Sequence, residues 1–130
     1  MMLLWPDRND NSGHFLNAKF KDKRFRFAKL HCQAVRDTER IVAFVVMKCQ
    51  PIAVYIFGEL IEANLFDDHS HIQLAIEGPV PADLAESLIQ GIKRISGFSV
   101  DLLFLADCQP ALVRSIRQTG FRAYEIAGAG

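Results

Sequence analysis

The chain has 130 residues and a formal net charge of zero; half of the residues are hydrophobic and ten are phenylalanine. This length suits one domain with a sizeable core, and this composition argues against disorder except at the ends of the chain. The balanced charge gives no overall attraction to nucleic acid or to a membrane surface. The most apolar stretch, IVAFVVM at residues 41–47, is far shorter than the roughly 20 residues that a membrane-spanning helix needs.

The chain has three cysteines, Cys32, Cys49 and Cys108, which are widely spaced and form no CxxC pair. This pattern is typical of reduced thiols in a cytoplasmic protein rather than of a disulfide framework or a zinc site. The opening MMLLWPDRND has too short an apolar run for a signal peptide. We therefore expect a cytoplasmic protein with no membrane segment.

Residues 1–28 are expected to form an N-terminal arm or extension, and residues 29–130 the folded domain. Within this first part, residues 19–29 (KFKDKRFRFAK) interleave phenylalanines with basic side chains, and their secondary structure stays open. Aromatic and basic side chains together are what a surface for single-stranded nucleic acid uses. The alternative is that the phenylalanines pack on the domain while the charges stay in solvent.

The next elements are a helix and a pair of strands. Asp37 or Thr38 is expected to cap a helix that Pro51 ends. Residues 52–57 (IAVYIF) form a continuously apolar run that predicts a buried strand ending at Gly58. A half-turn of helix and a loop follow at residues 60–69. Residues 70–77 (SHIQLAIE) alternate apolar and polar side chains, as a strand does.

The second half of the chain predicts a helix, a strand, a helix and a strand. Residues 78–97 carry a helix with Pro81 near its first turn and an apolar stripe at helical spacing. Residues 99–105 form a strand, a helix begins near Pro110 and ends at Gly120, and residues 121–126 add an edge strand. The fold class is therefore α/β (α+β), with a mixed sheet of about four strands flanked by helices.

This arrangement resembles the minimal nucleotidyltransferases of the DNA polymerase beta superfamily, which include antitoxin-type stand-alone domains. The resemblance runs from about residue 38 to 125. It is carried by a strand ending in FG, a short acidic loop, an alternating strand, a helix, the motif VDLL, and the tail DLLFLADCQPALVRSIRQTGFRAYE. The family motif is Gly-Ser after the first strand, Asp-x-Asp on the second strand and a third Asp on the next. Members transfer a nucleotide from a nucleoside triphosphate, usually with two magnesium ions.

The resemblance assigns the motif positions to five residues of this chain. Gly58 matches the motif glycine and would bind the triphosphate by close backbone approach. Glu59 replaces the motif serine, and His71 and Gln73 replace the two aspartates on the second strand. Asp101 in VDLL matches the third carboxylate. Three of the four side chains that would carry the chemistry are therefore changed.

The physical consequence is the loss of a magnesium site. Two magnesium ions about 3.5–4 Å apart need bridging anionic oxygens, and magnesium favours oxygen ligands. Gln73 offers one neutral oxygen, and His71 offers a nitrogen that suits transition metals. The only metal ligands left would be Asp101 and His71. The run DDHSH at residues 67–71 is a second place where a transition metal could bind, although such loops are common without metal.

These observations favour a catalytically degenerate nucleotidyltransferase-like protein that acts by binding, with no cofactor expected. Its partner would be another protein, such as the helical HEPN-type proteins that pair with many small members of the family, its own copies, or a retained nucleotide. The alternative is an active nucleotidyltransferase that uses Mg²⁺ with altered ligands, with Glu59, Asp68 or His71 joining Asp101. A third reading is nucleic-acid binding through residues 19–29.

Overall fold

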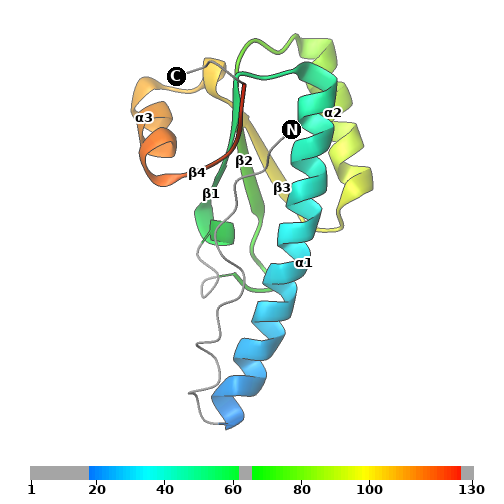
Figure 1. Ribbon diagram of the computed structural model, residues 1–130, viewed down its shortest axis with the longest axis vertical. Coiled ribbons are helices and arrows are strands. Elements are labelled where there is room, and N and C mark those ends of the chain that lie inside the picture. Colours follow the sequence, from blue (N-terminus) through cyan, green and yellow to red (C-terminus); the bar gives the residue numbers. More distant parts are fainter. Residues whose placement is uncertain (1–17, 62–65, 127–130) are drawn as a thin grey trace.

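The computed structural model describes residues 18–61 and 66–126, with side chains from residue 29 onward. These residues form three helices and a four-stranded mixed sheet, in the order helix, two strands, helix, strand, helix, strand. Figure 1 shows the sheet in the middle, with α1 and α2 on one face and α3 on the other. The predicted fold class and element order are confirmed.

Helix α1 runs without interruption from Ala18 to Cys49. The predicted helix start at Asp37 or Thr38 is therefore wrong, because both side chains act inside the helix. The Thr38 hydroxyl donates a 2.7 Å hydrogen bond to the backbone carbonyl of Ala34, as threonines in helix interiors do. The helix ends as predicted before Pro51, and Gln50 follows it with a positive φ of 48°.

The same helix also crosses residue 28, where the sequence suggested that an arm ends and the domain begins. The basic and aromatic run at residues 19–29 is thus helical in its backbone, and nearly all of its side chains lie outside the described residues. In the part of the chain that the structure describes, none of the helices combines the length and the apolar character that crossing a bilayer requires.

The four strands form one sheet in the order β3-β2-β1-β4. The central strand β1 (Ala53–Phe57) is antiparallel to both of its neighbours, β2 (Ile72–Glu77) and β4 (Phe121–Glu125). Strand β3 (Val100–Phe104) is parallel to β2 and lies at the outer edge. All four predicted strands are present, with ends that differ by one or two residues from the expected ones.

Two helices connect the later strands. Helix α2 (Ala82–Ile95) follows Pro81 and joins β2 to the parallel strand β3. Helix α3 (Pro110–Thr119) has a proline in its first turn and ends before Gly120, as predicted, and it joins β3 to β4 after the short turn η4 (Leu105–Asp107).

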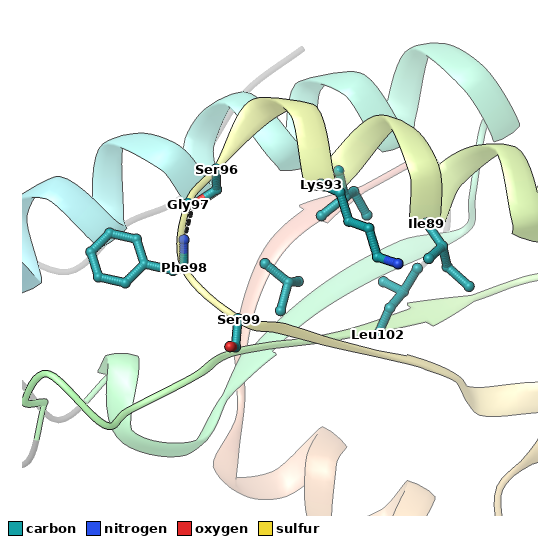
Figure 2. A pocket seen from close by; sticks show the side chains of 9 residues that line it. Ile89, Lys93, Ser96, Gly97, Phe98, Ser99 and Leu102 are labelled. Atoms are coloured by element: carbon teal, nitrogen blue, oxygen red, sulfur yellow. Dashed lines mark hydrogen bonds between the residues drawn. The ribbon is translucent and has the colours of Figure 1, made fainter.

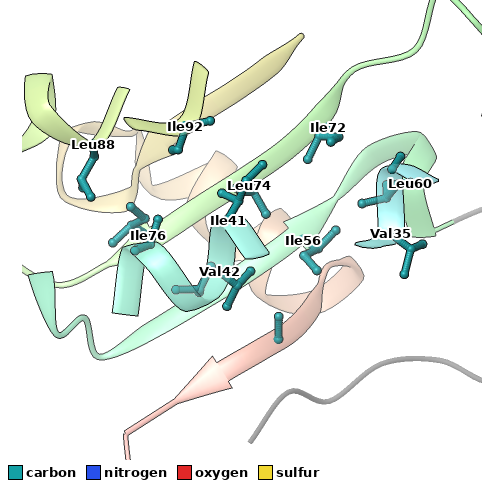
Figure 3. Close-up of a cluster of buried hydrophobic side chains, with 14 of the residues drawn as sticks. Val35, Ile41, Val42, Ile56, Leu60, Ile72, Leu74, Ile76, Leu88 and Ile92 are labelled. Atoms are coloured by element: carbon teal, nitrogen blue, oxygen red, sulfur yellow. The ribbon is translucent and has the colours of Figure 1, made fainter. Parts of the chain in front are cut away.

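The main core lies between the sheet and the two helices α1 and α2 (Figure 3). The alternation of β2 places Ile72, Leu74 and Ile76 on this face, and all three are fully buried. Opposite them, the apolar stripes of the helices contribute further buried side chains, among them Val35, Ile41, Val42, Leu88 and Ile92.

The other face of the sheet carries a smaller cluster under α3. Tyr55, Ala75, Leu105 and Ile116 are its main buried side chains. Because α3 has only ten residues, it covers this face in part. The beginnings of β2 and β3, which carry the residues of the candidate site, therefore stay accessible on this side.

Candidate functional site

The candidate site lies where the end of β1 meets the beginnings of β2 and β3. Phe57 of β1 pairs with Gln73 of β2, and Gln73 pairs with Asp101 of β3. Side chains of directly paired residues point to the same face of a sheet. The site positions suggested by the resemblance, Gly58, Gln73 and Asp101, are thus brought together by strand register.

Gly58 ends β1 in a conformation that favours glycine, with φ at +78°. It begins the short turn η2 (Gly58–Ile61). A β-carbon at this position would lie 1.8 Å from the side-chain oxygen of Gln73. Gln73 therefore lies over the glycine, in the space through which the resemblance expects a phosphate to approach.

His71 and Asp101 form the next pair along this end of the sheet. The Nδ1 atom of His71 lies 3.2 Å from a carboxylate oxygen of Asp101, and the two side chains are 49% and 47% exposed. Such an exposed ion pair contributes at most about 1 kcal/mol, and only while the histidine is protonated. Asp101, which the resemblance assigns to a metal-binding carboxylate, therefore has a histidine beside it.

Glu59 is turned toward the loop before β2. Its carboxylate accepts a 2.6 Å hydrogen bond from the hydroxyl of Ser70, which is buried. The Ser70 hydroxyl in turn accepts a 2.9 Å hydrogen bond from the backbone N–H of Asp67. Glu59 thus stabilises the loop, and the sequence did not single out Ser70 as its partner.

The loop DDHSH folds on itself. The backbone N–H of His69 donates to a carboxylate oxygen of Asp67 at 2.9 Å. This hydrogen bond, helped by Ser70, lowers the pKa of the Asp67 carboxyl below its ordinary value. Asp68 and His69 are both largely exposed, and their closest contact is 3.8 Å.

The turn after Gly58 is supported from behind by α1. The Nε2 atom of His31 lies 2.6 Å from the carbonyl oxygen of Leu60. The His31 ring also packs edge-on against the buried Phe66, which packs in the same way against Phe98. Sequence reasoning did not include His31, because the α1 segment around it was not predicted to be helical.

Among the residues that the structure describes, no three or more His, Cys, Asp or Glu side chains come close enough together to hold a metal ion. This applies to DDHSH and to a set built on Asp101 with Glu59, Asp68 or His71. What the site does contain is one amide, one His–Asp pair and one carboxylate that is already hydrogen-bonded. Comparison of the sequence with models of known protein families gives no match, and comparison with curated proteins gives no match either.

Proposed function

We propose that this chain is a nucleotidyltransferase-like protein that acts by binding and does not transfer nucleotides. The observation that carries the proposal is the contact of Gln73 with Gly58. The neutral Gln73 amide lies over Gly58, the residue that the resemblance assigns to close approach of a triphosphate. To bind a triphosphate there, the Gln73 side chain would first have to move away.

The charges around the contact support the same conclusion. Developing negative charge in phosphoryl transfer is balanced by metal ions that several carboxylates hold. Here Asp101 is paired with His71, and the Glu59 carboxylate accepts a hydrogen bond from Ser70. Asp101 has a histidine beside it, and the Ser70 hydroxyl oxygen lies 2.6 Å from the Glu59 carboxylate and 3.2 Å from that of Asp67.

The function is then carried by a partner. Within this proposal the partner is a protein, such as a helical protein of the HEPN type in a toxin–antitoxin pair, or a second copy of the chain. We also place the protein in the cytoplasm, where its three free cysteines would stay reduced. A nucleotide retained at the site around Gly58 without turnover is the remaining form of the proposal.

The test is thermal unfolding of the full chain with ATP or GTP, each with and without Mg²⁺ or Mn²⁺. A ligand at 100 times its dissociation constant adds about 2.7 kcal/mol of stability, which raises the unfolding temperature of a domain this size by about ten degrees. The proposal predicts no metal-dependent shift. A shift without metal that Gln73→Ala enlarges would mean that the site around Gly58 retains a nucleotide and that Gln73 restricts its binding.

The competing function is an active nucleotidyltransferase with altered metal ligands. It predicts transfer of label from radioactive ATP to the chain or to a partner, and loss of that transfer in Asp101→Ala. The matched control is Asp83→Ala, which removes an exposed carboxylate from the first turn of α2. Transfer that Asp101→Ala abolishes and Asp83→Ala leaves intact would overturn the binding proposal.

A further inference from the structure

A groove runs between α2 and the edge strand β3, away from the site at Gly58 (Figure 2). It has a volume of about 490 Å³ and is open to solvent. Ile89 and Ile92 from the helix and Val100 and Leu102 from the strand form its apolar walls. Figure 2 shows the Lys93 side chain reaching along it between Ile89 and Leu102.

The outer edge of β3 carries free backbone hydrogen-bonding groups. The carbonyl of Ser99 accepts a bond from the N–H of Ile72, so the alternate residues of β3 from Ser99 onward point their backbone groups toward β2. Val100, Leu102 and Phe104 therefore point theirs outward. No other strand of the described residues pairs with this edge.

Strand β3 of the described structure carries no lysine or proline, and its pairing with β2 shows no bulge. Edge strands are commonly protected by lysine, proline or a bulge. Strand β3 reads VDLLF, and its single charge, Asp101, lies on the opposite face beside His71. Leu102 is only partly buried although it packs against the main core. The edge and the groove beside it form one surface with apolar walls, the Lys93 side chain and unpaired backbone groups.

We propose that a second copy of this chain docks on this surface, with the two β3 strands pairing antiparallel about a two-fold axis at Leu102. Two-fold contacts need a self-complementary surface. In the register centred on Leu102, Val100 of one copy pairs with Phe104 of the other, and the backbone groups of both residues point toward the partner strand. Each such pair exchanges two backbone hydrogen bonds. The result is one continuous eight-stranded sheet.

Charge complementarity on α2 selects a second copy over another partner. Lys93 is exposed and takes part in none of the ion pairs of the described residues. Glu86 precedes Lys93 by two helical turns and therefore lies on the same side of α2. Helix α2 runs antiparallel to β3, and in the dimer the two α2 helices lie on either side of the two-fold axis. Glu86 of one copy therefore faces Lys93 of the other. By symmetry, Lys93 of the first copy faces Glu86 of the second.

This inference specifies the second-copy form of the proposed function, and it rests on α2 and β3 rather than on the contact of Gln73 with Gly58. The dimer would form whether or not the site around Gly58 binds nucleotide, so a failed dimer test and a failed nucleotide test can be told apart.

The test is sedimentation of the full chain over a range of concentrations, with a charge exchange on α2. We expect a concentration-dependent dimer. Lys93→Glu and Glu86→Lys should each raise its dissociation constant by about tenfold or more, because each places like charges together twice. The double variant Glu86→Lys/Lys93→Glu restores the opposite pairs and should return the dimer to nearly its original affinity.

The matched control is Arg94→Glu, which makes the same charge change at an exposed position on the opposite flank of α2 and should leave the dimer unaffected. In the dimer the amide N–H of Leu102 should exchange slowly with solvent, and in Lys93→Glu it should exchange fast. A monomer at all concentrations would overturn the proposal. So would a dimer whose dissociation constant neither single variant changes, or one whose affinity the double variant does not restore. If the chain stays monomeric and the Leu102 amide N–H exchanges slowly only after a peptide is added, the proposal is also overturned, and the groove would be assigned to a strand from another protein.

Discussion

The side-chain oxygen of Gln73 lies so close to Gly58 that a β-carbon on the glycine would lie 1.8 Å from it. Two constraints therefore act on Gly58. Its φ of +78° disfavours any other residue, and the amide occupies the space above it. The first constraint comes from the backbone, whereas the second comes from the end of a flexible side chain that can move.

Gly58→Ala should therefore lower the free energy of unfolding by about 1–2 kcal/mol, mostly through the left-handed backbone. Adding Gln73→Ala should recover little of this loss, because it relieves only the contact. Chemical denaturation of the three variants measures both effects. Gly97→Ala is the control, since a β-carbon there meets no atom within 4 Å. Full recovery by Gln73→Ala would show that the contact, not the backbone, makes glycine necessary.

A second prediction concerns the hydrogen bond that joins α1 to the end of α2. The buried Ser96 hydroxyl donates to the buried Asp37 carboxylate at 2.6 Å, and Arg40 donates to the other oxygen. Ser96→Ala removes one donor from a buried charge and should cost about 1–3 kcal/mol in unfolding free energy. Ser87→Ala, at an exposed position of α2, should cost nothing measurable. Equal stability of the two variants would show that water replaces the lost donor at Asp37.

The same hydrogen bond explains why the start of α1 was predicted wrongly. Asp and Thr are typical N-cap residues, so the sequence around Asp37 favours a helix start. The use of Asp37 by Ser96 depends on a contact between residues 59 positions apart, which no local pattern reveals. The strands were predictable because their apolar periodicity and the flanking Gly and Pro residues are local signals.

In the candidate site, too, some features follow from local sequence signals and others depend on tertiary packing. Placing Gly58, Gln73 and Asp101 near strand ends was enough to suggest that they meet. The position of the Gln73 amide over Gly58, the turning of Glu59 toward Ser70 and the support from His31 are side-chain arrangements. They depend on the packed tertiary structure, and residue type and spacing alone leave them open.

The close approach of α1 and α2 gives a third prediction. A β-carbon on Gly91 would lie 2.2 Å from the ring of Phe44. Gly91→Ala gains up to about 1 kcal/mol in helix propensity but forces the ring aside, so we expect a net loss of about 1–2 kcal/mol. Combining it with Phe44→Leu should cost less than the sum of the two single variants in a double-mutant cycle. Strict additivity would mean that the two residues do not compete for this space.

The thiols give a fourth prediction, about reactivity. Cys32 is exposed, whereas Cys49 is half-buried and burial raises the pKa of its thiol. Because the thiolate is the reactive form, Cys49 holds less of it at neutral pH. Mass spectrometry after brief alkylation should find Cys32 modified well before Cys49. The rate at Cys49 should keep rising with pH beyond the ordinary thiol range, and equal rates at pH 7 would contradict this ordering.

The central position of β1 has a consequence for how the sheet is made on the ribosome. Strand β1 pairs with β2, which follows soon after it, and with β4, which is translated after α2, β3 and α3. At 5–20 residues per second, β4 follows β2 by roughly 2–10 s. Throughout that interval β1 (AVYIF), the most apolar strand, is an edge strand of the nascent sheet. Only pairing with the C-terminal strand β4 makes it an interior strand.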